Sequence, residues 1–350
     1  MTTYKDRRKI FANKINLFDG RKRMSKIWLN LIKDFQINNS TLRGYGLSTF
    51  NERKINLYIS LKNILDFIFK CISYTTIKTR KVFLNALSWI VFEQQANAAS
   101  KFGFDIFSRK IYDEKLMKEF LKKYRKYNIG FSHNTFKCYF FLKEIKKYVK
   151  LKKDIKIFEI GAGVFNFGHL LSLELKKFDY IICDLPEMIL KAHEQITDMY
   201  IPFCYGNYEV YLPNELEKFN NSQCGRKILF ITGKQLEDKA IRKSLALRRF
   251  DLFINHESFA EMSINTVNLY LDYLPMLMKK NSIINIVNRH TRPQAKSQEE
   301  YKKIKLEDIT CFEDYKLKFC NLIVKKIDYF RAKIPVMQML PNIFFIGRMK

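Results

Sequence analysis

Glycine and proline are scarce in this sequence, at 12 and 7 of 350 residues. That shortage argues against repeats and long linkers. The seven cysteines are scattered and form no C-x-x-C pair, so the spacing of a zinc site and of a disulfide framework are both missing. Because 47% of the residues are apolar, including 31 Phe and 19 Tyr, we expect a packed globular chain with room for two domains.

Long hydrophobic runs are also missing. The most apolar early stretch, LYISLKNILDFIFKCI, is interrupted by Lys62, Asp66 and Lys70, whereas a membrane span needs about 20 nearly uninterrupted apolar residues. The first 20 residues are basic but lead into no apolar segment typical of a signal peptide. We therefore expect a cytoplasmic protein without a transmembrane segment, for which peripheral membrane contact stays open.

Acidic residues are outnumbered, 35 against 63 Lys and Arg, which gives a net charge of +28. Such a charge attracts nucleic acid, anionic membrane surfaces, and acidic or nucleotide-linked sugars. The lysines are spread through almost every segment rather than gathered in a stripe, which favours a compositional bias of the whole chain. The charge by itself therefore names no partner.

The spacing of apolar residues divides the chain near residue 150. Up to that point they recur at helical spacing, which predicts a helical N-terminal region over 1–150. From about 155, short runs rich in Ile, Phe and Val alternate with helical stretches, including single helices over 164–178 and 233–249. This alternation predicts a second domain over 151–350, an α/β fold with a doubly wound, Rossmann-like parallel sheet.

The first predicted strand ends in the sequence FEIGAGVF. Gly161 and Gly163 allow a tight turn and a close approach of the backbone to a ligand, and the N-terminus of the following helix offers free N–H groups. The third glycine of a dinucleotide-binding G-x-G-x-x-G loop is missing, and the bulky Phe165 follows the glycine pair instead, so an NAD site is disfavoured. A plain turn between strand and helix is the alternative for a lone G-x-G pair.

The second predicted strand ends in YIICDLP. A carboxylate at Asp184 can accept hydrogen bonds from both hydroxyls of a ribose. Asp184 would alternatively be the N-cap of a helix that begins with Pro186. This combination favours a nucleoside-containing cofactor: a strand, a glycine pair, a helix, and a second strand that ends in Asp.

The FEIGAG segment, with Glu159 ahead of the glycines, and the later CDLP resemble the cofactor site of class I S-adenosylmethionine-dependent methyltransferases. FDLFINHESFAEM and IINIVNRH resemble the corresponding strands of the sugar O-methyltransferase family. The resemblance covers roughly residues 130–295. It implies that S-adenosylmethionine is the cofactor, with Glu159 near its methionine part, Asp184 on its ribose and Thr232 at its adenine edge. The expected cofactor-binding residues are Glu159, Gly161, Ala162, Gly163, Asp184, Leu185, Thr232 and Asn255.

Transfer of a methyl group to a hydroxyl needs positioning and a general base. The resemblance places the segment after FDLFIN opposite the reacting methyl group. His256 is the leading base because imidazole titrates near neutral pH, and Glu257 and Glu261 are the alternatives. A hydrogen-bonded loop histidine is the competing interpretation for His256. Ser258 and Glu261 also have the spacing of a capping box for the next helix.

The next predicted strand ends in IVNRHTR. Arg289 and Arg292 suit carboxylate or phosphate groups, so we expect them, with Ser258 and His290, to bind an acceptor that is small or a glycan and carries negative charge. Simple solvation of the two arginines is the alternative. No compact Asp/Glu cluster follows the strands, and we expect no metal.

The most consistent function is transfer of a methyl group from S-adenosylmethionine to a sugar hydroxyl, in polysaccharide or glycan synthesis. A nucleic-acid methyltransferase is favoured by charge, but the segment INHES has neither an Asn-Pro-Pro-aromatic motif nor a cysteine nucleophile. A non-catalytic partner protein with the same fold is the third alternative, and Phe165 is the residue that favours it.

Overall fold

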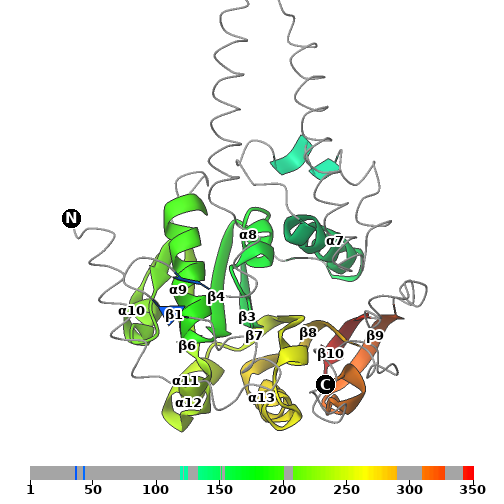
Figure 1. Ribbon diagram of the computed structural model, residues 1–350. Coiled ribbons are helices and arrows are strands. Elements are labelled where there is room, and N and C mark those ends of the chain that lie inside the picture. Colours follow the sequence, from blue (N-terminus) through cyan, green and yellow to red (C-terminus); the bar gives the residue numbers. More distant parts are fainter. Residues whose placement is uncertain are drawn as a thin grey trace, which may run out of the picture.

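The computed structural model describes part of the chain (Figure 1), namely residues 36–37, 42–43, 119–120, 122–124, 133–149, 151, 154–200, 208–289, 310–327 and 342–350. Most of the predicted helical region 1–150 therefore lies outside the described residues. Within it, β1 (Gln36–Ile37) and β2 (Leu42–Arg43) form a small antiparallel pair.

One eight-stranded sheet forms the centre of the fold, in the order β5-β6-β4-β3-β7-β8-β10-β9. Strand β10 is antiparallel to β8 and β9, and the other pairs are parallel. This order, with one antiparallel strand inserted after the last parallel pair, is that of the Rossmann-like class I methyltransferases, which confirms the predicted fold. The strands are β3 (Asp154–Ile160), β4 (Lys177–Asp184), β5 (Glu209–Tyr211), β6 (Arg226–Thr232), β7 (Phe250–His256), β8 (Met278–Arg289), β9 (Cys320–Ile327) and β10 (Asn342–Met349).

Helices cover both faces of the sheet and enclose two separate cores (Figure 1). On one face lie α7 (His133–Tyr148), α8 (Asn166–Ser172) and α9 (Pro186–Glu194), followed by the π-helix η4 (Gln195–Tyr200). The other face is covered by α10 (Leu216–Asn221), α11 (Gly233–Glu237), α12 (Lys239–Ala246), the 3-10 helices η6 (Ser258–Glu261) and η9 (Phe312–Asp314), and α13 (Ile264–Leu277). No helix among the described residues is long and apolar enough to cross a membrane.

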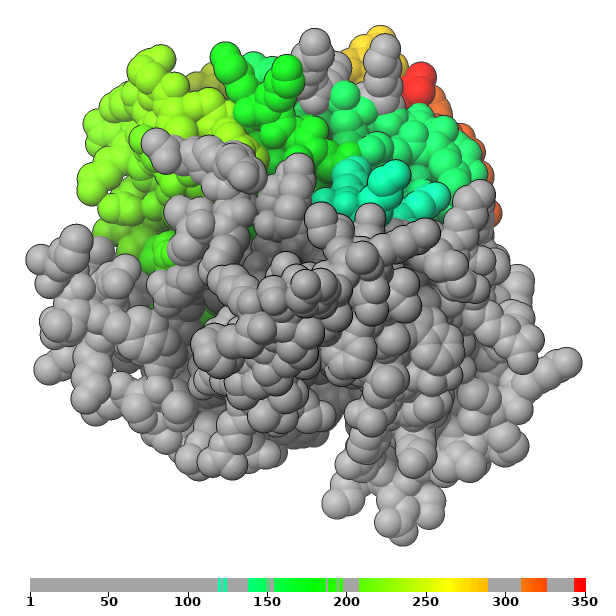
Figure 2. Space-filling model, turned by 90° about the horizontal axis from the view of Figure 1, so that it is seen from above, coloured from blue at the N-terminus to red at the C-terminus, as the bar shows by residue number. Residues whose placement is uncertain are grey.

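Helix α7 precedes the predicted domain boundary at 150, yet its side chains share a core with the sheet. Phe141 and Ile145 of α7 are buried with Leu170 and Leu171 of α8. Seen from above, the surface of α7 adjoins that of the segment that includes α8 (Figure 2). The helix before the first sheet strand is thus part of the packing that supports it.

Two predicted helices are shorter than expected. The helix predicted over 164–178 ends at Ser172, because Lys177 already begins β4. The helix predicted over 233–249 is divided into α11 and α12 at Asp238. The carboxylate of Asp238 accepts hydrogen bonds from the backbone N–H groups of Ala240 and Ile241 and so begins a new helix instead of continuing the old one.

Candidate functional site

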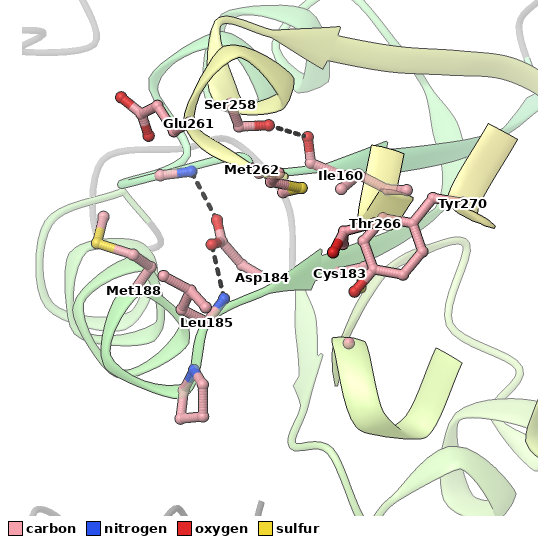
Figure 3. A pocket seen from close by; sticks show the side chains of 14 residues that line it. Ile160, Cys183, Asp184, Leu185, Met188, Ser258, Glu261, Met262, Thr266 and Tyr270 are labelled. Atoms are coloured by element: carbon pink, nitrogen blue, oxygen red, sulfur yellow. Dashed lines mark hydrogen bonds between the residues drawn. The ribbon is translucent and has the colours of Figure 1, made fainter. Parts of the chain in front are cut away.

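A pocket opens at the carboxyl edge of the sheet, where the ends of β3 and β4 face η6 and α13 (Figure 3). Its cavity of about 110 Å³ is smaller than the roughly 300–1,000 Å³ of most small-molecule sites. The lining consists of Ile160, Gly161, Gly163, Cys183, Asp184, Leu185, Pro186, Met188, Gly233, Ser258, Glu261, Met262, Thr266 and Tyr270.

The glycine pair forms the turn between β3 and α8. Gly161 and Gly163 have φ angles of +74° and +58°, in the left-handed region that favours glycine. A Cβ added to Gly163 would meet only Met188 Cε, at 3.9 Å. The backbone at Gly163 is therefore open to close approach by a ligand.

Asp184 joins the two strand ends that border the pocket. Its Oδ2 accepts a hydrogen bond from the backbone N–H of Gly163 at 2.9 Å, and its Oδ1 accepts one from the N–H of Leu185 at 2.7 Å (Figure 3). The N-cap of α9 is Leu185, so the alternative interpretation of Asp184 as that N-cap is wrong. A carboxylate has about four acceptor positions, so these two bonds are compatible with further hydrogen bonds from ligand hydroxyls.

Phe165 has the backbone conformation that a glycine would adopt at its position, with φ +66°. Its ring is buried under α8 and packs edge-on against Tyr180, with the ring centroids 5.2 Å apart. Gly168, one turn into α8, makes room for it, because a Cβ there would lie 2.0 Å from the ring. The Phe165 ring therefore packs beneath the helix and does not line the pocket.

A network of amide and hydroxyl side chains ties together the strand ends behind the pocket. Asn255 Nδ2 donates to Ile160 O at 2.8 Å, and Ser258 Oγ donates to the same carbonyl at 3.0 Å. Asn288 Nδ2 donates to Asn255 Oδ1 at 2.6 Å, and Asn288 Oδ1 accepts from the N–H of Ala260. Since Asn255 is fully buried and not in the pocket lining, it holds β3, β7 and β8 in place.

Ser258 lines the pocket and also belongs to this network. The capping box predicted for Ser258 and Glu261 is wrong, because the Ser258 hydroxyl is directed to β3. The residue that caps α13 is Ser263, whose hydroxyl accepts from the N–H of Thr266.

Glu159 lies beneath the glycine turn, outside the pocket lining, and is only 2% exposed. Its Oε2 accepts a hydrogen bond from Tyr180 Oη at 2.7 Å. Burial raises the pKa of Glu159 to about 8, the Tyr180 bond opposes this rise, and the negative charge of Asp184 adds to it. Glu159 is thus protonated through most of the neutral range, on the opposite side of β3 from the pocket-lining Ile160.

We expect Glu159 to make folding less favourable as pH rises. Its pKa is about 8 in the folded protein and 4.5 in the unfolded chain. The folded state therefore keeps a proton that the unfolded state loses, and the free energy of unfolding falls between about pH 4.5 and 8. Glu159→Gln removes this contribution, so urea unfolding should show a shallower decline for the variant across that window. Tyr180→Phe, which removes the opposing hydrogen bond, should extend the decline to higher pH. Parallel curves for wild type and Glu159→Gln would contradict the assignment.

Two further predicted cofactor residues are outside the pocket lining. Thr232 is buried and forms a capping box with Gln235 at the start of α11, while the next residue, Gly233, lines the pocket. Ala162 is partly buried against the core on the α8 face.

The three candidate bases lie at different places around the end of β7. Glu261 lines the pocket. Glu257 has φ +67°, and its N–H donates to Val287 O at 2.6 Å. His256 lies on the α7 and α8 side, where its ring contacts Phe141 and Phe167 at centroid distances of 4.9 and 4.5 Å. Only Glu261 of the three is therefore part of the pocket lining.

The predicted acceptor-binding arginines fall largely outside the described residues. Arg289 ends β8, the strand beside β7, at the predicted edge of the sheet. His290 and Arg292 are not among the described residues. Within the described part of the chain, no group of three or more His, Cys, Asp or Glu side chains is arranged to hold a metal ion.

Sequence reasoning missed the part of the pocket that α13 supplies. Thr266 and Tyr270 lie four positions apart and so share one face of that helix. The four-residue spacing is visible in the sequence. The sequence does not show that this face of the helix is directed toward the edge of the sheet. Cys183, the first residue of the CDLP segment, and Met188, two residues after its end, also line the pocket.

No protein-family model matches the chain, and no curated protein matches it. Among solved structures it is similar to a protein from Pyrococcus horikoshii, with 15% identity, a TM-score of 0.40 and coverage of 66% of this chain and 99% of that one. A SAM-dependent methyltransferase from Methanosarcina mazei is 11% identical with a TM-score of 0.34, and the match covers 59% of this chain and 96% of that one. The Synechocystis magnesium protoporphyrin IX methyltransferase with bound SAH is 10% identical with a TM-score of 0.36, and the match covers 68% of this chain and 100% of that one. Values this low assign no function, and the fold rests on the strand order.

Proposed function

We propose that the protein is an S-adenosylmethionine-dependent methyltransferase that methylates a hydroxyl group of a sugar. The observation that carries the cofactor proposal is the pocket at the carboxyl edge of a class I methyltransferase sheet, with Asp184 and the open backbone of Gly163 in its lining. The preference for a sugar hydroxyl rests on the resemblance of the segment around Asn255 and Ser258 to the sugar O-methyltransferases.

The pocket residues fit a nucleoside. Asp184 presents a carboxylate suited to ribose hydroxyls, while Leu185, Met188 and Met262 supply apolar surface for a base. Tyr270 and Thr266 of α13 complete the lining (Figure 3). We propose that the adenosine part of the cofactor binds here.

S-adenosylmethionine supplies a methyl group on a sulfonium, which an acceptor oxygen can displace once it is oriented and loses its proton. The protein holds the proposed proton acceptor, His256, two residues before Ser258 of the pocket lining. The contacts with Phe141 and Phe167 limit the freedom of the imidazole ring. The proposed acceptor site therefore lies on the α7 side of the end of β7.

Asp184→Ala should raise the cofactor's dissociation constant at least tenfold. The substitution removes two expected ribose contacts, each worth about 0.5–1.5 kcal/mol or more when a charge takes part, and about 1.4 kcal/mol is one decade. It also releases the N–H groups of Gly163 and Leu185. Calorimetric titration with S-adenosylmethionine measures the change, with Glu209→Ala, outside the pocket lining on β5, as the control.

The acceptor class is tested with labelled S-adenosylmethionine and three acceptor sets, namely nucleotide sugars, glycan extracts and RNA. Label in a sugar or glycan is the expected result. Label in RNA alone would replace the sugar hydroxyl by a nucleic-acid acceptor. No binding heat from S-adenosylmethionine would favour a non-catalytic partner protein instead.

A further inference from the structure

The sheet brings basic residues that are distant in the sequence to one edge. Parallel strands begin at the same edge, and the antiparallel β10 ends there, because Arg348 of β10 pairs with Ile283 near the start of β8. Strand β9 begins beside the end of β10, where Cys320 pairs with Met349. Six neighbouring strands, from β4 to β9 in sheet order, therefore share this edge, which is opposite the pocket. With about 4.8 Å between strands, the edge is roughly 24 Å long.

Exposed basic side chains stand at the strand ends along this edge. Lysines that are spread evenly through the sequence are thus gathered by the topology of the sheet. We call the surface formed by these side chains and the strand ends that carry them the amino edge. Its exposed cations are Lys176, Lys177, Arg249, Lys280, Lys318 and Arg348.

The acidic side chains near the amino edge are largely neutralised by other basic residues. None of the six exposed cations forms an ion pair with an acidic residue in the described part of the chain, so their charge faces solvent. One exposed acidic residue, Asp154 at the start of β3, lies among them. The ion pairs of the other acidic residues join Asp179 to Arg248 and Lys227, Asp251 to Lys279, and Glu174 to Lys123 and Lys146.

Apolar side chains protrude at the same edge. Leu247, in the turn between α12 and β7, is 86% exposed, Leu322 of β9 is 59% exposed, and Met276, two residues before β8, is 38% exposed. The turns that carry Leu247 and Met276 adjoin, because Arg249 Nη1 donates to Met278 O at 3.2 Å. Three of the five large apolar side chains that are exposed in the described part of the chain therefore lie among the cations. Exposed apolar side chains that gather in one place indicate an interaction surface.

Cations combined with protruding aliphatic side chains suit an anionic lipid surface. Each Lys or Arg close to such a surface strengthens binding about fivefold, and an apolar side chain gains free energy by entering the boundary between headgroups and acyl chains. Single-stranded nucleic acid is held instead by stacking of its bases on aromatic rings. Leu247, Met276 and Leu322 carry no ring, so the combination of side chains at the amino edge favours lipid.

We propose that the amino edge is a docking face for a membrane that contains anionic phospholipid, with the basic side chains on the headgroups and Leu247 inserted among them. The cofactor pocket lies at the other end of the strands. Strand β3 has 7 residues, so at about 3.3 Å per residue the two edges are roughly 23 Å apart. The pocket therefore faces away from the bilayer, and membrane docking does not depend on the reaction proposed for the pocket.

Flotation of the full chain with lipid vesicles tests the proposal without any acceptor or cofactor. One set of vesicles consists of phosphatidylcholine alone, and the other contains phosphatidylserine in addition. Because several cations act together, we expect binding to be at least roughly tenfold tighter to the vesicles with phosphatidylserine. Equal binding to both sets, or binding to neither, would overturn the proposal.

A pair of charge variants distinguishes the amino edge from the net charge of the chain. Lys280→Gln/Arg348→Gln removes two exposed cations of the edge and should weaken vesicle binding by roughly twentyfold. The matched control is Lys234→Gln/Lys239→Gln, which removes two exposed cations from α11 and α12 and should change binding little. An equal loss in both variants would assign the binding to total charge and overturn the proposal. Urea unfolding should be unchanged, since all four side chains are exposed.

A leucine variant and an RNA titration separate a membrane from a nucleic acid. Leu247→Ser should weaken vesicle binding by roughly tenfold, because it removes an inserted apolar side chain. Leu269→Ser, at an exposed position within α13, is its control and should have little effect. Single-stranded RNA that binds the wild-type protein but not Lys280→Gln/Arg348→Gln, with no binding to vesicles, would make nucleic acid the partner of the amino edge and overturn the proposal.

Discussion

His256→Ala should lower the rate of methyl transfer by a factor of roughly 10²–10⁴, the range that a positioned general base contributes, while cofactor affinity stays within about twofold. The physical reason is the separation of the two sites. His256 is absent from the pocket lining and contacts the aromatic rings of α7 and α8 instead. Single-turnover rates with a saturating acceptor measure the first quantity, and calorimetry with S-adenosylmethionine the second.

The control variants for His256→Ala are the two neighbouring carboxylates. Glu261→Gln changes a pocket-lining side chain, so its main effect should be on cofactor affinity. Glu257→Gln keeps the size of the side chain and the backbone N–H that donates to Val287 O, and should change little. If His256→Ala transfers methyl groups at the wild-type rate, His256 is not the base, and whichever carboxylate variant loses turnover takes its place.

Gly161→Ala should destabilise the protein by about 2–5 kcal/mol. A side chain in the left-handed region costs about 1–2 kcal/mol, and overpacking adds about 1–3 kcal/mol. The overpacking is specific, because the new Cβ would lie 1.9 Å from Ser258 Oγ and 2.1 Å from Ser258 Cβ. Ser258 cannot easily yield, since its hydroxyl bonds Ile160 O and accepts from Asn255. Urea unfolding measures the loss.

Gly163→Ala is the matched control, because it has the same kind of positive φ but open space around it. We expect only the conformational cost of about 1–2 kcal/mol, together with weaker cofactor binding where the methyl group enters the pocket. The double variant Gly161→Ala/Ser258→Gly removes the steric conflict and should be less destabilised than the sum of the two single variants. Equal losses for Gly161→Ala and Gly163→Ala would show that φ alone makes glycine necessary at both positions.

The parts of the site that the sequence predicts well are those set by a few consecutive residues. Gly161 and Gly163 come directly after β3, and Asp184 is the last residue of β4. Parallel strands bring their carboxyl ends to one edge of the sheet, so these residues are expected to lie together. The alternation of strands and helices likewise predicts that β3, β4, β6, β7 and β8 run parallel in one sheet.

The parts that it predicts poorly depend on neighbours distant in the chain. Asn255 has the residue type and spacing of a ligand-binding position, yet its amide is directed to Ile160 O, 95 residues earlier. Likewise β10 is inserted between β8 and β9, a pairing that no local pattern encodes. The pocket contributions of Thr266 and Tyr270 depend on how α13 is turned against the sheet.

The Phe165 ring and Gly168 together change how the glycine loop can be recognised. The space that a third glycine would leave open beside the turn is filled by an aromatic ring, and the small residue appears three positions later, inside α8. The side-chain sizes at the two positions should therefore covary among homologues. A homologue with glycine at 165 can carry a larger residue at 168, whereas a homologue with a large residue at 165 needs a small residue at 168. A motif for this loop should thus require small residues at 161 and 163, and a small residue at either 165 or 168.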